Sequence, residues 1–301
     1  MTVVRRLHQR VAQAAVEGQL WQPGQRILVA VSGGLDSVCL VDLLHLTVGL
    51  HGGVLEVGTV DHGVRPDSAE DAAFVVALAE SRGLPAHRFD LQLGEAASEA
   101  TCRQARYEAL ESVGADRLAV GHHADDQAET VLMQLCRGSG LQGIAGMRAR
   151  RGHRVRPLLG VRRAELEAWA GYRGLRYRED PSNTDPRYTR NRVRAELMPL
   201  LESIWPGAGG RIARAGLRLG DDAAVIHALA EQAPPLPWDL TWARSTESAV
   251  LRRALLLRLE GLEHRHVAAI LDVIRRGSGW VELPGGRGVG VRGGHLVCEG
   301  A

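Results

Sequence analysis

The sequence contains no lysine: all 37 of its basic residues are arginine. This absence excludes a Walker-type phosphate loop, which places a lysine on the phosphates of a nucleotide. It also excludes any mechanism that forms a Schiff base on a lysine of the protein. Any chemistry on nucleotides or carbonyl groups in this chain must therefore use other side chains.

Cysteine is scarce as well, and long apolar runs are missing. Cys39, Cys102, Cys136 and Cys298 are far apart and form no Cys-x-x-Cys pair, which argues against a zinc ribbon, a disulfide scaffold and a dithiol redox site. No apolar run reaches the roughly 18 residues of a membrane-spanning helix. The N-terminal segment also lacks the apolar block of a signal peptide. We therefore expect a cytoplasmic protein with no membrane partner.

Short apolar runs alternate with helical patterns in the first half of the chain. The strand-like runs lie at 26–31, 54–60, 86–91 and 117–121, and the helical patterns at 36–46, 68–82, 98–113 and 124–137. Strands that alternate with helices predict a parallel sheet with helices on both faces. The predicted fold class is α/β, with a Rossmann-like sheet whose ligands bind at the carboxyl ends of the strands.

The character of the sequence changes near residue 205. Beyond this point we expect two long helical segments, 211–232 and 248–276, followed by two or three short strands with glycine turns. The sequence thus predicts a catalytic domain at 1–204 and a smaller, mostly helical domain with short terminal strands at 205–301.

The most informative stretch is Ser-Gly-Gly-Leu-Asp-Ser, residues 32–37, between a predicted strand and a predicted helix. Glycines let backbone amides approach phosphates, and the start of a helix attracts an anion. Ser32 and Ser37 can donate hydroxyl hydrogen bonds, whereas Asp36 would repel a phosphate unless Mg²⁺ lay between them. The alternative is a simple turn in which Asp36 caps the helix. The whole string favours a nucleotide-phosphate site.

A second polar group lies at the start of the helix predicted at 124–137. It comprises His122, His123, Asp125, Asp126 and Glu129. Asp126 and Glu129 are three residues apart and therefore share one helical face, where they can bind an ammonium group or a metal. The alternative is that acids in a first turn only complement the helix dipole. A zinc site is disfavoured because no third soft ligand follows at ligand spacing.

Arginine is concentrated in one part of the chain. Residues 148–194 contain 14 arginines and 5 acids, so this window carries a charge of +9. Within it, Arg190, Asn191, Arg192 and Arg194 cluster at the start of a helix, where guanidinium groups can contact an RNA backbone. A solvated basic surface is the alternative.

The order and spacing of these segments resemble one family. "SGGLDS" at 32–37 resembles the loop of the N-type ATP pyrophosphatases, the PP-loop superfamily. Together with "VDHGVR" at 60–65, "GHHADDQAETVLMQL" at 121–135 and "RNRVR" at 190–194, it resembles the tRNA(Ile)-lysidine synthase family. The resemblance covers about residues 20–205 and, more loosely, the tail at 281–297.

The resemblance implies an ATP-dependent ligase with Mg²⁺. ATP would adenylate the C2 oxygen of the wobble cytidine in a CAU-anticodon tRNA(Ile), and free L-lysine would then displace AMP to form lysidine. Because longer members of the family continue beyond the end of this sequence, we expect the 205–301 segment to supply the tRNA discrimination. Homodimerisation is left open.

The resemblance also assigns roles to individual residues. Asp36 would hold Mg²⁺, and Arg103 and His122 would lie near the phosphates as catalytic residues. Asp126 and Glu129 would bind the amino groups of lysine. The ATP loop would be formed by Ser32, Gly33, Gly34, Leu35, Asp36 and Ser37, and the tRNA contacts by Arg190, Asn191, Arg192 and Arg194.

Three other functions compete with this interpretation. A tRNA cytidine thiolase uses the same adenylation step, but it needs paired cysteines for a cluster or a persulfide. A PP-loop enzyme of small-molecule metabolism would not need the basic window. A non-catalytic RNA-binding module would have no reason to keep Asp36, Asp126 and Glu129.

Overall fold

A computed structural model describes residues 4, 6–63, 68–94, 98–178, 185 and 187–300. Its contacts divide the chain into two compact units, Met1–Arg218 and Leu219–Ala301. The division falls within helix α12 (Ala208–Glu231), whereas the boundary predicted from the sequence lies before this helix. Among the described residues, none of the helices has the length and apolarity that a bilayer-spanning segment requires.

The first unit contains a six-stranded sheet in the order β3-β2-β1-β4-β6-β5. All neighbouring strands are parallel except β5 and β6, which form an antiparallel pair. The strands are β1 (Arg26–Ala30), β2 (Val54–Asp61), β3 (Ala86–Asp90), β4 (Arg117–Ala119), β5 (Arg150–Arg151) and β6 (Arg154–Val155). The four strands predicted from the sequence and the mostly parallel α/β fold are confirmed.

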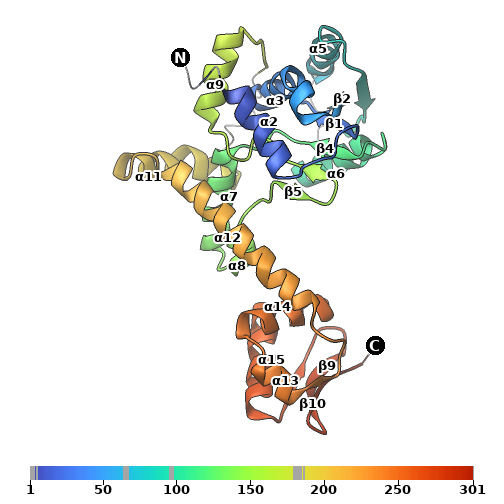
Figure 1. Cartoon of the computed structure of the whole chain (residues 1–301), viewed down its shortest axis with the longest axis vertical. Helices are drawn as coiled ribbons and strands as arrows, with labels where there is room; N and C mark the ends of the chain where they lie inside the picture. Colours follow the sequence, from blue (N-terminus) through green and yellow to red (C-terminus); the bar gives the residue numbers. More distant parts are fainter. Residues whose placement is uncertain are drawn as a thin grey trace. The chain divides into compact units, whose positions relative to one another are not determined.

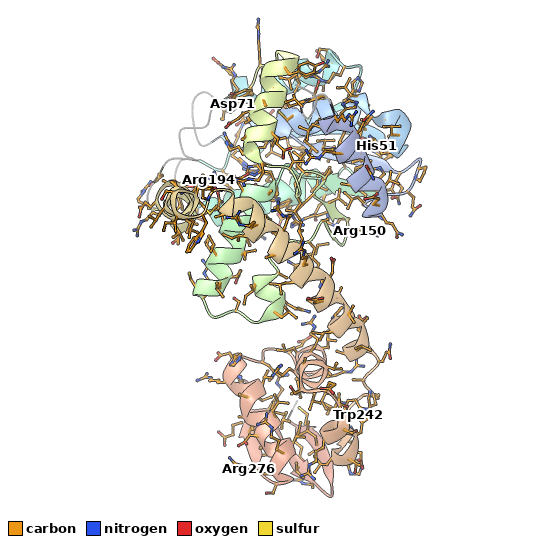
Figure 2. All side chains as sticks on the ribbon, turned by 60° about the vertical axis from the view of Figure 1, so that its left-hand side comes forward. His51, Asp71, Arg150, Arg194, Trp242 and Arg276 are labelled. Atoms are coloured by element: carbon orange, nitrogen blue, oxygen red, sulfur yellow. The ribbon has the colours of Figure 1, made fainter. Side chains whose placement is uncertain are left out.

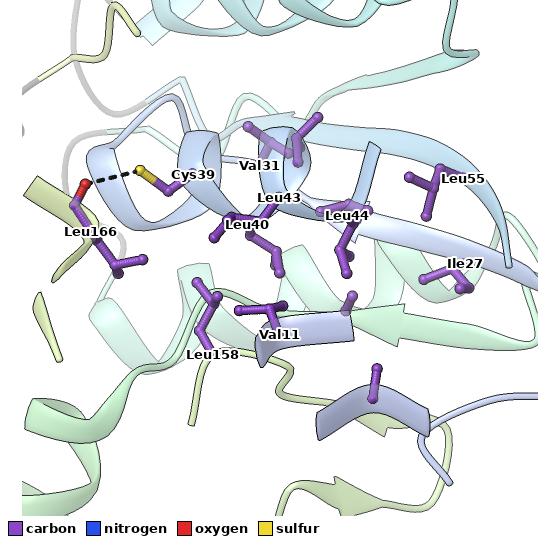
Figure 3. Close-up of a cluster of buried hydrophobic side chains, with 14 of the residues drawn as sticks. Val11, Ile27, Val31, Cys39, Leu40, Leu43, Leu44, Leu55, Leu158 and Leu166 are labelled. Carbon is purple, nitrogen blue, oxygen red and sulfur yellow. Dashed lines mark hydrogen bonds between the residues drawn. The ribbon is translucent and has the colours of Figure 1, made fainter. Parts of the chain in front are cut away.

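Helices cover both faces of this sheet, and strand β1 shows why. Its side chains alternate between the faces: Ile27 and Val29 pack into one hydrophobic cluster, and Leu28 packs into another. The first cluster receives side chains from α2, α3, α5 and α9, and the second from α6. Figure 1 shows the helices around the sheet, and Figure 3 shows side chains of the first cluster. The bounds are α2 (Leu7–Glu17), α3 (Leu35–Leu46), α4 (Val48–His51), α5 (Ser68–Glu80), α6 (Glu99–Glu111) and α9 (Arg163–Arg173).

A buried carboxylate fixes helix α9 against helix α3. Asp42, with a side chain only 2% exposed, accepts hydrogen bonds from Trp169 Nε1 at 3.0 Å and from Arg173 Nε at 3.1 Å. Cys39 Sγ donates to the carbonyl oxygen of Leu166 at 3.5 Å in the same interface (Figure 3). Because a buried charge with several donors holds a fixed geometry, these contacts hold α9 against α3.

The remaining helices of the first unit follow the chain from the sheet to α12. They are α7 (Ala124–Cys136), α8 (Leu141–Ile144), α10 (Thr189–Arg192), a π-helical turn η2 (Val193–Leu197) and α11 (Met198–Ile204). Buried residues of α7, Ala124 and Ala128, pack with Met198 and with Ala213 of α12.

The second unit pairs helices with an antiparallel sheet in the order β7-β10-β9-β8. Its core includes Trp238, Leu255, Ile270 and Leu296, all almost completely buried. The elements after α12 are β7 (Trp238–Asp239), α13 (Leu240–Ser245), α14 (Ser248–Arg258), α15 (His264–Arg276), β8 (Trp280–Glu282), β9 (Gly288–Arg292) and β10 (His295–Glu299). The predicted combination of helices and short terminal strands is confirmed.

Candidate functional site

The Ser-Gly-Gly loop leaves the carboxyl end of β1, at the place where the order of strands reverses. Strand β1 has β2 on one side and β4 on the other. Such a switch point is where ligands bind in open α/β sheets. Gly121 follows β4, and a Cβ atom built on it would lie 3.2 Å from the carbonyl carbon of Asp36. The segment after β4 therefore packs directly against the loop because it has no side chain there.

The loop uses two of its own backbone N–H groups and leaves others available. The N–H of Ser32 donates to Ser37 Oγ at 3.3 Å, and the N–H of Gly34 donates to Ser32 Oγ at 3.5 Å. Gly33 has a φ of +88°, in the left-handed region that favours glycine. Ser37 Oγ donates to the carbonyl oxygen of Gly34 at 2.9 Å and closes the turn. Helix α3 begins at Leu35, and no side chain caps its first turn. The interpretation of Asp36 as a helix cap is therefore wrong, and the start of α3 can receive an anion.

Asp36 is the acid of this loop, and its two oxygens differ. Oδ2 lies 3.4 Å from Arg163 Nη1 and 3.6 Å from His123 Nε2. Oδ1 is buried and has no hydrogen-bond partner among the described residues. A buried carboxylate oxygen without a donor fits a Mg²⁺ ligand, since this ion takes one or two carboxylates together with phosphate oxygens.

His123 links the loop to the start of α7. Its Nδ1 accepts from the backbone N–H of Asp125 at 3.2 Å, so the ring caps the helix and directs Nε2 toward Asp36. Burial by itself lowers the pKa of this imidazole, but the carboxylates of Asp36, Asp126 and Asp125 raise it above its ordinary value. The sequence indicates a role for His122 but none for His123, because the helix-capping position of His123 depends on the folded chain.

Helix α9 brings two arginines to the same place. Arg162 Nη2 lies 2.8 Å from Asp125 Oδ1, and the backbone N–H of Arg163 donates to Asp125 Oδ2 at 2.7 Å. Arg163 then extends toward Asp36. The sequence did not single out either arginine, because these contacts are long-range. Arg163 is 38 residues from Asp125 and 127 residues from Asp36 along the chain.

The two carboxylates predicted to bind lysine form ion pairs with two of the arginines predicted to bind tRNA. Arg190 Nε lies 2.8 Å from Glu129 Oε2, and Arg194 Nε lies 2.7 Å from Glu129 Oε1. Both arginines also contact Asp126 Oδ1, while Asp126 Oδ2 accepts from the backbone N–H of His123 at 3.0 Å. All four carboxylate oxygens are thus engaged, and the Glu129 side chain is only 2% exposed. Arg194 is labelled in Figure 2.

The other two predicted tRNA contacts point elsewhere. Arg192 is exposed and pairs with Glu196 at 3.0 Å, one turn further along. Asn191 Nδ2 donates to the carbonyl oxygen of Asp185 at 2.9 Å. Arg190 and Arg194 share a face because they are four residues apart, and Arg192 does not. Within the predicted RNA-binding group, the structure thus separates an inward-facing pair from an exposed arginine.

The predicted catalytic residues His122 and Arg103 lie beside a further arginine. Arg156 Nε donates to His122 Nδ1 at 3.3 Å. Burial lowers the pKa of His122 to about 4, and the charges of Arg156, Arg190 and Arg103 reinforce burial while Asp126 opposes it. His122 is therefore a neutral imidazole near pH 7.

The net charge of the arginine-rich window is offset by acids from earlier in the chain. Asp42, Asp125, Asp126 and Glu129 all accept from arginines of this window. The window is therefore less basic as a surface than its composition indicates.

At the end of β2, Arg106 Nε donates to His62 Nε2 at 3.1 Å. Arg65 and residues 179–184, also part of the family-like strings, lie outside the described residues.

The lowered pKa of His122 predicts a pH dependence of stability. The folded pKa of about 4 lies below the ordinary 6.5, so the unfolded chain binds this proton first as the pH falls. The associated stability is fully present above pH 6.5, and on the order of 3 kcal/mol is lost on descending to pH 4. Urea unfolding of the protein and of His122→Asn at pH 7 and pH 4.5 measures this. An equal loss in both proteins would contradict the prediction.

Comparison with known proteins gives three relevant similarities. The chain matches the family model of the PP-loop domain over residues 2–201. It is 39% identical to a tRNA(Ile)-lysidine synthase of Thermobifida fusca, with 88% of each chain covered. It is 43% identical to a tRNA(Ile)-lysidine synthase of Geobacter sulfurreducens over 72% of this chain, but it spans only 49% of that protein.

A solved structure has a similar fold. A U34-tRNA thiolase from Methanococcus maripaludis, solved with its [4Fe-4S] cluster, superposes with a TM-score of 0.57 and 22% identity. The match covers 70% of this chain and 78% of the thiolase. At this identity the similarity concerns the fold.

Proposed function

Because the chain belongs to the PP-loop domain family and, within it, to the tRNA(Ile)-lysidine synthases, we propose that it joins free L-lysine to the wobble cytidine of CAU-anticodon tRNA(Ile). The observation that carries this proposal is Asp36, with its unpartnered buried oxygen beside an uncapped helix start. This arrangement suits the phosphates of ATP together with Mg²⁺.

In the first step, the C2 oxygen of the cytidine attacks the α-phosphorus of ATP. The bond between the α-phosphorus and the bridging oxygen breaks, and pyrophosphate leaves. The loop at 32–37 would hold the leaving pyrophosphate through backbone N–H groups and the hydroxyls of Ser32 and Ser37. Asp36 would hold Mg²⁺, which supplies positive charge to the phosphates when bound. Arg163, which already lies next to Asp36, provides a cation where the loop has no lysine.

In the second step, the ε-amino group of lysine attacks C2, AMP leaves, and the attacking nitrogen loses a proton. Asp126 and Glu129 would bind the ammonium groups of free lysine. In the structure these acids are engaged by Arg190 and Arg194. Lysine therefore has to displace at least one arginine, whose guanidinium can then contact a phosphate of the tRNA. The same two arginines would thus pair with the acids before lysine binds and contact RNA once lysine has displaced them.

The thiolase alternative is less well supported by the cysteines. Cys39 is buried in α3, and burial raises the pKa of its thiol to about 12, which makes it a poor nucleophile. In the described part of the chain, no three His, Cys, Asp or Glu side chains are grouped to hold a metal ion.

The proposal is tested by single-turnover modification of a CAU-anticodon tRNA(Ile) transcript with ATP, Mg²⁺ and labelled lysine. The control is the methionine tRNA that bears the same anticodon. We expect label in the isoleucine tRNA only, with binding that weakens as salt increases. Release of pyrophosphate without incorporation of lysine would support the proposed adenylation step and contradict the proposed attack by lysine.

A further inference from the structure

Arg156 is a half-buried arginine that has no carboxylate partner among the residues that the structure describes. It follows β6 at the carboxyl end of the strand. Its Nη1 donates to the carbonyl oxygen of Arg148 at 2.8 Å and its Nε donates to His122 Nδ1 at 3.3 Å, while Nη2 makes no hydrogen bond to a described residue. The guanidinium therefore keeps at least one NH₂ group available for a ligand.

The surroundings of Arg156 are positively charged. Burial lowers the pKa of its guanidinium, and the phenol of Tyr107 opposes this. The charges of Arg103, Arg151 and Arg154 each lower the pKa further. Arg103 and Arg154 also line an open cavity of about 460 Å³ together with Tyr107. A guanidinium placed among other cations is unfavourable unless an anion joins it.

Other partly buried arginines of this region do not share this feature. Arg162 faces Asp125 and Glu202, and Arg194 faces Glu129 and Asp126. For both, nearby carboxylates outweigh burial and raise the guanidinium pKa above its ordinary value. Of these three arginines, Arg156 alone has no carboxylate partner among the described residues.

His122 adds a second donor next to Arg156. Because Nδ1 accepts from Arg156, the proton of the neutral ring is on Nε2, which makes no hydrogen bond to a described residue. The charged groups that act on this ring are Asp126 of α7, Arg103 of α6, Arg156 and Arg190. Gly121, the preceding residue, packs against the loop at Asp36. The pair therefore lies next to the phosphate loop.

We propose that Arg156 and the Nε2–H group of His122 form an anion site for a phosphate of one of the substrates. The inference rests on the proposed function, which supplies two sources of this group, ATP and the phosphodiester backbone of tRNA. The guanidinium supplies the charge, and the imidazole supplies a directed neutral donor whose tautomer Arg156 fixes.

The test compares Arg156→Gln with Arg137→Gln. Arg137 is exposed at the C-terminal end of α7 and makes no ion pair in the described structure, so it is a matched loss of one positive charge. Two affinities are measured without lysine: that of a non-hydrolysable ATP analogue by calorimetry, and that of the CAU transcript by filter binding at several salt concentrations.

We expect Arg156→Gln to weaken one of these affinities by about tenfold or more, the loss of one charge-assisted contact, and Arg137→Gln to change each by less than about twofold. A loss confined to the analogue identifies the nucleotide as the source. A loss confined to the transcript, with a salt slope lower by about one, identifies the RNA. Equal behaviour of the two variants would overturn the inference while leaving the proposed function intact, whereas a parent protein that binds neither ligand would overturn both.

An NMR titration of His122 distinguishes the loss of the Arg156–His122 contact from misfolding of the variant. In Arg156→Gln, the NMR titration of His122 should move from about 4 toward 6.5, because a nearby positive charge is lost. Arg156→Lys retains the charge and should keep His122 closer to its parent pKa. If the His122 titration were the same in the parent and in Arg156→Gln, the pairing of the two residues would be refuted.

Discussion

Replacing Asp36 with asparagine should reduce tRNA-dependent release of pyrophosphate by at least about 100-fold, with little effect on stability. The loss of rate follows from removing the charge that would hold Mg²⁺ against the phosphates, an electrostatic contribution of typically a few kcal/mol to a transition state. Stability should hardly change because Oδ1 has no hydrogen bond to lose and the contacts of Oδ2 are 3.4 Å or longer.

The measurement is a single-turnover assay with ATP labelled in its γ-phosphate, alongside urea unfolding of the same preparations. Asp222→Asn is the control, since Asp222 is exposed on α12 and makes no ion pair in the described structure. A rate for Asp36→Asn within about threefold of the control would exclude a central role for this carboxylate.

Replacing Glu129 with glutamine should have two separate effects. The free energy of unfolding should fall by about 3 kcal/mol, because Arg190 and Arg194 would lose a partner whose side chain is only 2% exposed. Incorporation of lysine should fall by at least about 100-fold, while release of pyrophosphate continues. The two effects are separable because the assay can be run well below the unfolding midpoint of the variant.

Glu196→Gln provides the matched control for Glu129→Gln. Glu196 also pairs with an arginine, Arg192, but both side chains are about 60% exposed. Exposed pairs contribute little to stability, so no measurable change is expected. If Glu129→Gln incorporated lysine at the parent rate, the acidic pair could not be the lysine site, whatever happened to stability.

The sequence predicted the parts of the fold that depend on local pattern. Strands β1 to β4 are short apolar runs, and their number and order along the chain were predictable for that reason. Strands β5 and β6 were missed because each has only two residues, and three of these four are arginines. No periodicity can be recognised over two residues, and only their pairing with each other and with β4 defines them.

The candidate site was predictable in its members but not in its pairings. The loop at 32–37 and the face shared by Asp126 and Glu129 follow from spacing within one segment. The engagement of these acids by Arg190 and Arg194 joins residues more than 60 positions apart. Arg156 gave no local signal, since its significance is the lack of a counter-charge, which only the folded chain reveals. The assignment of individual residues to lysine and tRNA stays a prediction.

If lysine binds at the acidic pair as proposed, the two arginines there act as an intramolecular competitive inhibitor. A guanidinium tethered to the same chain would compete with free lysine at a high effective concentration. The apparent affinity for lysine is then the intrinsic affinity multiplied by the fraction of molecules whose acids are free. Lysine titrated into the protein alone should therefore bind more weakly than lysine titrated into the complex with tRNA, and the amino acid would be admitted mainly when its RNA acceptor is already present.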